Sequence, residues 1–426
     1  MSQHVVVIGA GLMGATTALA CLERGHRVTI LDPGEPGGAQ AASYGNGCWI
    51  NNGALMPVSV PGLWRQVPGY LMDPLGPFAI RWRYLPRLLP WLARFVRAGA
   101  TLAKVEATVR ARRPLLDGTV ASHTALAEAA GVSDLIVKRG LLYLYPDRAH
   151  FLSEALDWRM RRENGIVCRE LDEQALRALE PGIGPAYRFG VHVPEAGCNL
   201  TDPGAYVAAL VAHARSLGAR VERSRATGFA LSGTRLAAVI TETGEIACDK
   251  AVIAAGAWSG ALARQAGDAV SLETERGYHV VVRDPEYVPR HPIMTSDGKM
   301  AVTMTRAGLR AAGQVELGGL AAPPDWRRAD IQLAYLNRVF PALSARPDEA
   351  RLSRWMGHRP STPDGLPSLG RASASPDIVH NFGHGHTGVS MAPASARLVA
   401  DLVAGRPPAI DPTPYAPQRF SRRRGA

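Results

Sequence analysis

The sequence predicts an α/β protein in which a doubly wound domain is interleaved with a second, α+β domain built on an antiparallel sheet. Residues 4–31 read as strand, glycine-rich turn, helix and strand, the pattern of a βαβ unit. Residues 278–317 hold short apolar or alternating runs separated by Gly and Pro, which is typical of antiparallel strands. The chain then closes on strand, glycine-rich turn and helix at 378–402, which indicates a return to the first domain.

The first domain is predicted to come from three separate stretches, 1–62, 198–270 and 352–420. A chain of 426 residues that is 46% hydrophobic is long enough for two cores. The strands of this domain are expected at 4–8, 27–31, 220–222, 236–242, 251–255 and 378–381, and its helices at 13–24, at 206–217 and up to about residue 402.

The second domain is predicted to take residues 63–197 and 271–351. Helix dominates its first half, because 102–130 carries the spacing of one or two amphipathic helices. Its strands are expected at 278–282, 300–305 and 315–317, with a helix at 331–339 packed across them. Residues 421–426 are a basic tail that we expect to be flexible.

The composition limits the classes of partner that suit this chain. Lys and Arg outnumber Asp and Glu by 48 to 37, which favours an acidic small molecule or anionic lipid, and nucleic acid fits worse because no recognised module accompanies the charge. The five cysteines show neither a Cys-x-x-Cys pair nor a metal-ligand spacing, so we expect reduced thiols and no metal. No leader precedes the first strand and no run of 18 apolar residues occurs, which predicts a cytoplasmic protein.

A glycine-rich turn ends the first predicted strand. Its Gly-x-Gly-x-x-Gly spacing allows a pyrophosphate to approach backbone N–H groups, and an acidic residue ends the second strand, where a carboxylate can accept ribose hydroxyls. The residues predicted to bind a dinucleotide here are Gly9, Ala10, Gly11, Leu12, Met13, Gly14, Asp32 and Pro33.

The residues after Asp32 favour a flavin over a nicotinamide. Residues 37–47 are a run of small residues where a nicotinamide enzyme would start its next regular element, and a bare backbone suits a buried, extended cofactor. This run resembles the second FAD-contacting loop of the D-amino-acid oxidase superfamily. Residues 251–258 (AVIAAGAW) resemble the strand-and-glycine segment that lies beneath the same cofactor.

The resemblance extends nearly end to end and is closest to bacterial D-amino-acid dehydrogenases and glyphosate-oxidoreductase-like enzymes. Its motifs are segment 62–83 with MDPLGP at 72–77, TERGYH at 274–279, WMGHRPSTPDG at 355–365 and GHGHTG at 383–388. It implies a glutathione-reductase-like FAD-binding domain and noncovalent FAD, since Cys48 does not occupy a covalent-flavin position. The further FAD contacts that it implies are Ala42, Ser43, Asn46, Gly47, Ala226, Thr227, Ala255, Gly256, Trp258, Arg359, Gly383, His384, Gly385, His386, Thr387 and Gly388.

Four residues are predicted to act on the substrate. Arg359 lies in the motif Gly-x-Arg-Pro-x-x-Pro-Asp, and its guanidinium fork matches a carboxylate. Tyr278 and His279 are expected where a phenol and an imidazole face the flavin, although both also suit packing or structural hydrogen bonding. The resemblance places His386 in a turn against the flavin pyrimidine ring, where the following helix stabilises the charge that develops on reduction.

The implied reaction is FAD-dependent oxidation of a C–N bond, by hydride transfer to flavin N5 and hydrolysis of the imine to an oxo acid and an amine. D-Amino acids, imino acids, N-substituted glycines and glyphosate-like compounds fit equally. Quinone and O2 are both open as electron acceptors, so a dehydrogenase and an oxidase are not distinguished. A nicotinamide-dependent dehydrogenase or a nucleotide-binding protein is disfavoured by the small-residue run.

Segment 63–100 has two interpretations. The favoured one is a helical lid over the substrate cavity with solvated arginines; the alternative is a peripheral surface at the inner face of the cytoplasmic membrane. The residues on which both depend are Arg65, Arg81, Arg83, Arg87, Arg94 and Arg97 against the single acid Asp73, interleaved with Trp64, Trp82, Tyr84 and Trp91.

Overall fold

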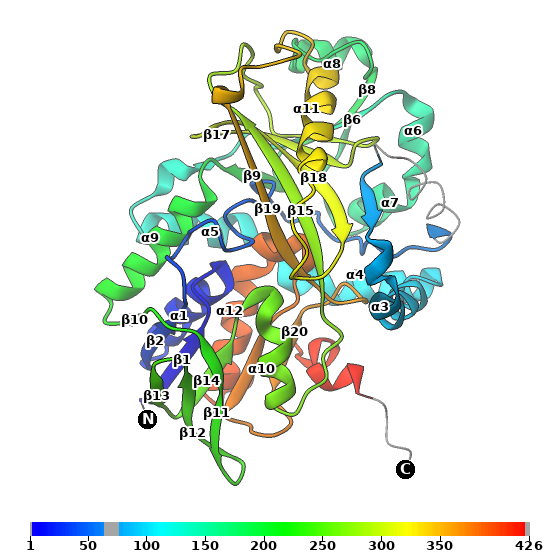
Figure 1. The fold of residues 1–426 in the computed structure, drawn as a ribbon. Helices are drawn as coiled ribbons and strands as arrows, with labels where there is room; N and C mark the ends of the chain where they lie inside the picture. The colour runs from blue at the N-terminus through cyan, green and yellow to red at the C-terminus, as the bar shows by residue number, and fades with distance from the viewer. Residues whose placement is uncertain (1, 64–75, 422–426) are drawn as a thin grey trace.

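Two large sheets organise the chain (Figure 1), and the predicted α/β fold class is confirmed. The structure, a computed structural model, describes residues 2–63 and 76–421. The first sheet has five parallel strands and one antiparallel edge strand. In spatial order these are β10 (Arg220–Glu222), β2 (Arg27–Leu31), β1 (His4–Ile8), β14 (Lys250–Ile253), β21 (Ile378–Phe382) and β20 (Ser368–Arg371).

Both faces of this sheet are covered, which explains why its central strands β2, β1 and β14 are mostly apolar and buried. Val5 and Val7 of β1 face helices, whereas Val6 and Ile8 pack with the opposite layer. The first layer comprises α1 (Leu12–Glu23), α9 (Pro203–Ser216) and α12 (Gly388–Val403). The second comprises α10 (Ser259–Gln265) and a meander of β11 (Ala226–Ser232), β12 (Arg235–Thr241) and β13 (Gly244–Ala247).

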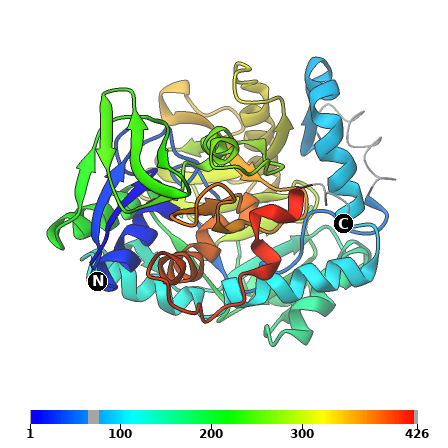
Figure 2. The same ribbon diagram turned by 90° about the horizontal axis from the view of Figure 1, so that it is seen from below.

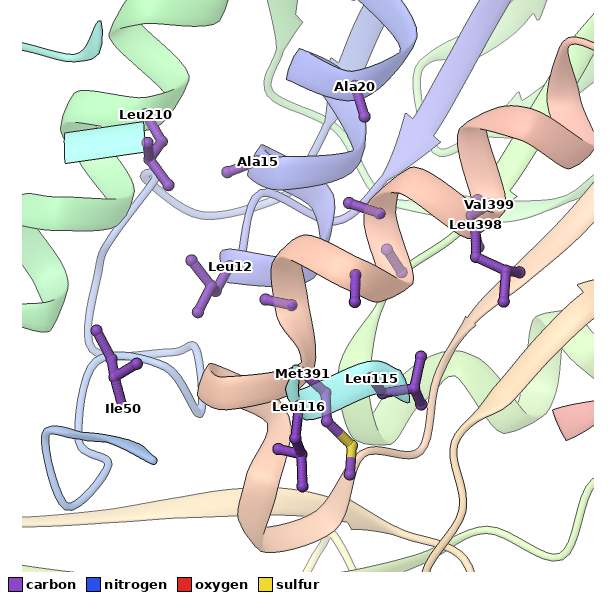
Figure 3. Packing of buried hydrophobic residues seen from close by; sticks show 14 of the residues in the cluster. Leu12, Ala15, Ala20, Ile50, Leu115, Leu116, Leu210, Met391, Leu398 and Val399 are labelled. Carbon is purple, nitrogen blue, oxygen red and sulfur yellow. The ribbon is translucent and has the colours of Figure 1, made fainter. Parts of the chain in front are cut away.

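Small side chains bring α1 and α12 together. Ala15 and Ala18 of α1 and Ala392 of α12 are almost completely buried, so the two helices pack closely across the sheet. Figure 3 shows this contact continuing into the large residues Leu116 and Met391. The start of the chain and its last long helix therefore share one core.

The second sheet is mainly antiparallel, and its long strands run toward the first sheet (Figure 1). Its parallel pairs are β16 with β6 and β18 with β4. In spatial order its strands are β19 (Leu352–Ser361), β15 (Glu273–Val282), β18 (Gly308–Leu317), β17 (Met300–Thr305), β16 (Ile293–Thr295), β6 (Leu141–Tyr145), β8 (Phe189–Val193) and β7 (Arg169–Leu171), with β4 (Phe78–Ile80) beside β18. Helix α11 (Arg327–Val339) packs on β15 and β18 through Leu336 and Val339.

The predicted domain boundary at residue 352 does not coincide with a boundary between the sheets. Residues 352–420 were assigned to the first domain, yet β19 pairs along its whole length with β15 in the second sheet. A charged, only partly buried strand is difficult to assign from sequence, because its pairing is set by the neighbouring strand. The domain division as a whole stays a prediction.

The helical part of the chain wraps around both sheets. Helices α4 (Leu102–Leu116) and α5 (Thr119–Ala129) occupy the region predicted to be helical, and both pack against α12. The other elements are α3 (Leu85–Ala98), α6 (Arg148–Ser153), α7 (Ala155–Glu163), α8 (Glu173–Leu179) and a small sheet of β3 (Trp49–Asn51), β9 (Gly197–Leu200) and β5 (Ile136–Val137). Figure 2 shows α3 and the β11–β13 meander at opposite sides of the molecule.

The described part of segment 63–100, which is residue 63 and residues 76–100, is only partly solvated. Trp91 is buried with Leu88 against Leu317, and Arg81 pairs with Glu316 at 2.6 Å, which corrects the expectation of uniformly exposed arginines. Trp64, Arg65 and Asp73, with most of the MDPLGP motif, lie outside the described residues, as does the predicted tail beyond Ser421.

Candidate active site

A cavity of about 1580 Å³ lies between the carboxyl ends of the parallel strands and the face of the second sheet. It is larger than a usual small-ligand pocket, which suits an extended cofactor together with a substrate. The predicted residues that line it are Gly9, Gly11, Leu12, Met13, Asp32, Pro33, Ala42, Ser43, Asn46, Gly47, Ala226, Thr227, Ala255, Gly256, Trp258, Arg359, His384, Gly385, His386, Thr387 and Gly388. Ala10, Gly14, Gly383, Tyr278 and His279 do not line it.

The glycine-rich turn is shaped by close backbone contacts. Gly9 has φ +117°, and a Cβ at this position would lie 2.4 Å from the carbonyl oxygen of Ala254. A Cβ on Gly14 would lie 1.7 Å from the carbonyl oxygen of Gly9, so Gly14 lets α1 approach the turn and does not itself face the cavity. The Asp32 carboxylate accepts a hydrogen bond from the backbone N–H of Ala10 at 2.7 Å, which fixes the turn beside this carboxylate.

The small-residue loop is held in place by side chains of the second sheet. Arg310 donates to the carbonyls of Tyr44 and Asn46 at 3.1 and 3.2 Å. The Trp355 indole donates to the Ala39 carbonyl at 2.8 Å, and its ring fills the space that a side chain on Gly45 would need. The loop is therefore rigid although its own residues are small.

His279 contacts this loop instead of the cavity, which corrects its predicted role. Its Nδ1 lies 3.1 Å from the Gly45 carbonyl, and its ring stacks on Trp355 with centroids 5.1 Å apart. Burial, followed by the charge of Arg310, lowers the pKa of His279 to about 3, so the ring is neutral and donates its Nδ1–H to the carbonyl.

Tyr278 points to the opposite face of β15, so its predicted flavin contact is also corrected. Its hydroxyl donates to Glu316 at 2.5 Å and accepts from the backbone N–H of Asp325 at 3.0 Å, and its ring packs edge-on against Trp326. Neighbouring residues of a strand face opposite sides of a sheet, so a cavity-facing Gly277 turns Tyr278 away.

A row of mostly small residues forms the floor of the cavity. Gly357 of β19 pairs with Gly277 of β15, whereas Ala312 of β18 pairs with His279 beyond the register shift in β15. Ala312, Ala301 of β17, Met294 of β16 and Tyr143 of β6 are matched from strand to strand, and these four residues line the cavity together with Gly357 and Gly277.

Arg359 stands above this floor. Its guanidinium donates to the carbonyls of Gln314 and Gly313 at 2.9 and 3.3 Å and lies over Gly277. Burial lowers the pKa of Arg359, and the nearby charge of Glu275 opposes this shift. Within residues 2–63 and 76–421, no carboxylate lies at ion-pair distance from this guanidinium, so an anionic ligand would satisfy it.

His386 lines the cavity and pairs with the buried carboxylate of Glu275 through Nε2. Burial acts to raise the pKa of Glu275, but the charge and hydrogen bond of His386, and then the charge of Arg359, outweigh it and hold this pKa below its usual value. Glu275 thus stays ionised between two cationic or imidazole groups. No motif pointed to Glu275, although alternation along TERGYH places it on the same face as Gly277.

The turn at 383–388 presents polar groups to the cavity. His384 is buried, its Nε2 lies 3.0 Å from the Ser395 hydroxyl, and its Nδ1 has no hydrogen-bond partner in the described chain. Burial lowers the pKa of His384 to about 3, so this nitrogen belongs to a neutral ring. The first residues of α12 line the cavity, so backbone N–H groups and the orphaned imidazole nitrogen are available to a bound cofactor.

The far end of the cavity contains residues that the sequence analysis missed. Tyr143 accepts a hydrogen bond from Asn51 at 3.0 Å, and the Arg161 guanidinium lies 4.9 Å from the centre of the Tyr143 ring. Arg161 also pairs with Asp157 at 3.1 Å. These groups come from α7, β3 and β6, and no local motif connects them, because the fold alone brings them together.

Comparison with known proteins places this geometry in context. The model of a family described as FAD dependent oxidoreductase (DAO) matches residues 4–402. A D-amino-acid oxidase of Bradyrhizobium diazoefficiens is 52% identical over 418 residues, covering 98% of this chain and 99% of that protein. A D-amino acid dehydrogenase of Methylobacterium sp. is 30% identical over 431 residues, covering 99% of this chain and all (100%) of that protein.

Among solved structures, glycine oxidase from Geobacillus kaustophilus is similar with a TM-score of 0.72 and 22% identity. The match covers 98% of this chain and 99% of that one. At this level of identity the likeness shows a shared fold.

Proposed function

This chain belongs to the DAO family of FAD-dependent oxidoreductases, and we propose that it oxidises the C–N bond of an amino acid or amine that carries a carboxylate. One observation carries the proposal. The Arg359 guanidinium stands in the cavity beside the His386–Glu275 pair, and no described carboxylate neutralises it at ion-pair distance. A substrate carboxylate supplies the missing partner.

Each residue of this group has a chemical task. Bound FAD supplies the acceptor for the hydride that leaves the carbon bearing nitrogen. Arg359 binds the substrate carboxylate with two parallel hydrogen bonds and thereby orients the neighbouring C–H bond. Glu275 accepts the Nε2–H of His386, which leaves Nδ1 as the acceptor for a proton of the substrate ammonium group. The amine lone pair is then free to form the C=N bond, and water converts the imine to an oxo acid and ammonia or an amine.

Among the carboxylate-bearing substrates, we propose D-amino acids. The relatives that match over nearly the whole chain carry the names D-amino-acid oxidase and D-amino acid dehydrogenase, which supports this choice. Imino acids, N-substituted glycines and glyphosate-like compounds contain the same carboxylate and nitrogen, and they remain the alternatives. The relatives include an oxidase and dehydrogenases, so O2 and quinone both stay candidates for the electron acceptor.

The substrate is tested by anaerobic titration of the purified enzyme while the flavin absorbance is recorded. The panel contains D- and L-amino acids, sarcosine, iminodiacetate and glyphosate, with the corresponding amines lacking a carboxylate as matched controls. We expect D-amino acids to bleach the flavin and the decarboxylated amines to fail. Equal bleaching by D-amino acids and by their decarboxylated amines would contradict the role of Arg359. Bleaching by another class of carboxylate compound, and not by D-amino acids, would identify that class as the substrate instead. Admitting air or a soluble quinone afterwards identifies the acceptor.

We also propose that the outer face of α3 contacts an anionic membrane surface. Trp82, just before α3, and Leu89 and Val96 on α3 are 65%, 54% and 43% exposed. The arginines interleaved with them are exposed and form no ion pair within the described chain; these are Arg83, Arg87, Arg94 and Arg97. Exposed apolar residues with unpaired arginines suit lipid headgroups. The inner face supports the lid interpretation too, because Phe95 lines the cavity.

Among the helices that the structure describes, none has both the length and the apolar character required to cross a bilayer. Membrane contact is tested by flotation with phosphatidylglycerol vesicles and with phosphatidylcholine vesicles at low salt. We expect flotation with the anionic vesicles and its loss in W82S/L89S. The control L152S removes an equally exposed leucine of α6 and should float like the unmodified protein. Failure to float with either vesicle would overturn this proposal.

A further inference from the structure

A buried arginine lies behind the wall of the cavity. Arg112 of α4 is 4% exposed, although it carries a guanidinium. It donates through one terminal nitrogen to the Met56 carbonyl at 2.6 Å and through the other to the Thr387 hydroxyl at 2.8 Å. Met56 and Thr387 both line the cavity, so this one side chain ties together two separate wall segments.

The contact with Thr387 reaches the turn itself. The Thr387 hydroxyl accepts from Arg112 and donates to the His384 carbonyl at 3.3 Å, which closes the turn that precedes α12. A hydrogen-bond chain therefore runs from the helical insertion to the residues proposed to face the flavin pyrimidine. Helices α4 and α12 also pack together, so Arg112 adds a hydrogen-bonded link between α4 and this turn to an existing helix contact.

Arg112 also brings a charge that is not fully balanced. Within the described parts of the chain, no carboxylate lies at ion-pair distance from it, and its Nε has no hydrogen-bond partner. The charge of Asp157 acts on Arg112, but Asp157 forms its ion pair with Arg161. Burial lowers the pKa of Arg112 to about 10, with Asp157 opposing the shift, so the guanidinium stays protonated at neutral pH. The region behind the turn thus has a net positive charge.

We propose that Arg112 is a positioning residue for the flavin: it locks the 384–387 turn and makes reduction of the bound flavin more favourable through its buried positive charge. The inference rests on FAD lying against this turn. Reduction adds negative charge to the pyrimidine end of a flavin, and a cation in a low-dielectric interior stabilises that charge more strongly than a solvated one does. The protein thereby tunes the cofactor electronically without touching the substrate.

The test compares R112M with R113M. Arg113 is the next residue on α4, but it pairs with Asp117 at 2.8 Å and is partly exposed. The reduction potential is measured by equilibrating the holoenzyme with a reference dye during enzymatic reduction by xanthine oxidase, which requires no substrate of this protein. We expect R112M to lower the reduction equilibrium constant about tenfold, about 30 mV for two electrons, and R113M to leave it unchanged.

Two further variants separate charge from geometry and remain informative if R112M fails to fold. R112K keeps the cation and T387V removes its partner in the turn. In both variants the reduction potential should stay close to that of the unmodified holoenzyme. FAD should dissociate from both several-fold faster, as measured by the recovery of flavin fluorescence. An unchanged potential in folded R112M would overturn the electrostatic role. Unchanged FAD release in R112K and T387V would overturn the positioning role. Neither readout depends on the substrate panel, so failure of the proposed substrate does not affect this test.

Discussion

The Arg359 guanidinium occupies the space that a side chain at position 277 would fill. A Cβ on Gly277 would lie 2.3 Å from Cζ of Arg359, and the two residues belong to the paired strands β15 and β19. The absence of a side chain on β15 therefore determines where the proposed carboxylate-binding group stands. This contact is with the far end of a flexible side chain, so the arginine can move away without disrupting the sheet.

Replacing Gly277 with alanine should consequently affect binding more than folding. We expect G277A to raise KM for a carboxylate substrate about tenfold, ~1.4 kcal/mol, while the melting temperature changes little. The matched control is G260A on α10, where a Cβ would meet nothing nearer than 3.7 Å. Equal KM values for G277A and G260A would show that the position of Arg359 does not matter for binding.

Removing the guanidinium itself should be more costly. We expect R359M to lower kcat/KM about 100-fold, ~3 kcal/mol, because a charged hydrogen-bonding pair is lost. The kcat/KM of R359K should lie between those of R359M and the unmodified enzyme, because lysine keeps the charge but cannot form two parallel hydrogen bonds. The decisive measurement is the ratio of kcat/KM for a substrate and for its decarboxylated amine. This ratio should collapse in R359M; a preserved ratio would place the carboxylate elsewhere.

The pairing of Glu275 with His386 should appear in the dependence of stability on pH. The folded-state pKa of Glu275 is lowered from 4.5 by His386 and Arg359 against the effect of burial. Its stabilising contribution is therefore present above pH 4.5 and is lost as the pH falls through the lowered value. The free energy of unfolding in urea should be higher for the unmodified protein than for E275Q at neutral pH. This difference should become smaller as the pH falls through the acidic range.

The matched variant for this experiment is E245Q, which alters an exposed glutamate on β13. It should follow the unmodified protein over the same range. If the difference in unfolding free energy between the unmodified protein and E275Q does not change with pH, the ionised Glu275 carboxylate is not stabilised by its neighbours.

The reassigned Tyr278 predicts a change in stability without a change in catalysis. Y278F removes the hydroxyl that donates to the buried Glu316 and accepts from Asp325. We expect a loss of about 1–2 kcal/mol in unfolding free energy, because the Glu316 carboxylate keeps its ion pair with Arg276 but loses one donor. KM and kcat should stay within twofold of the unmodified values. A large rise in KM would show that Tyr278 contributes to substrate binding.

The parts of the site that sequence predicts well are those encoded over short distances. The turn at Gly9, the acid Asp32 and the 383–388 turn each depend on a local pattern of strand, glycine and helix, and all of them meet at the cavity. Residues 37–47 were also recognised, since their small size is visible in the sequence itself. Their rigidity was not, because it comes from Arg310, Trp355 and His279 on distant strands.

The wrong predictions for Tyr278 and His279 concern the face of the strand to which a side chain points. TERGYH lies within β15, which begins at Glu273 and not at the predicted residue 278. The side chains of a strand alternate, and nothing in the six letters states which face meets the cavity. A register shift between Arg276 and Tyr278 adds to this uncertainty. Gly277 lines the cavity, and Glu275 pairs with the cavity residue His386. Arg112, Tyr143 and Arg161 escaped notice for another reason: helices and strands remote in sequence bring them to the site.

The position of β21 in the first sheet has a consequence for how the enzyme is made. This strand lies between β14 and β20, and α12, which follows it, covers α1. A ribosome releases β1 first, so the apolar face of α1 waits without its partner helix through most of translation. The cavity wall formed by residues 384–390 is therefore missing until nearly the whole chain has been synthesised. A product interrupted before α12 would expose the Ala15 and Ala18 surface to chaperones and proteases, and it would have no partial activity to preserve.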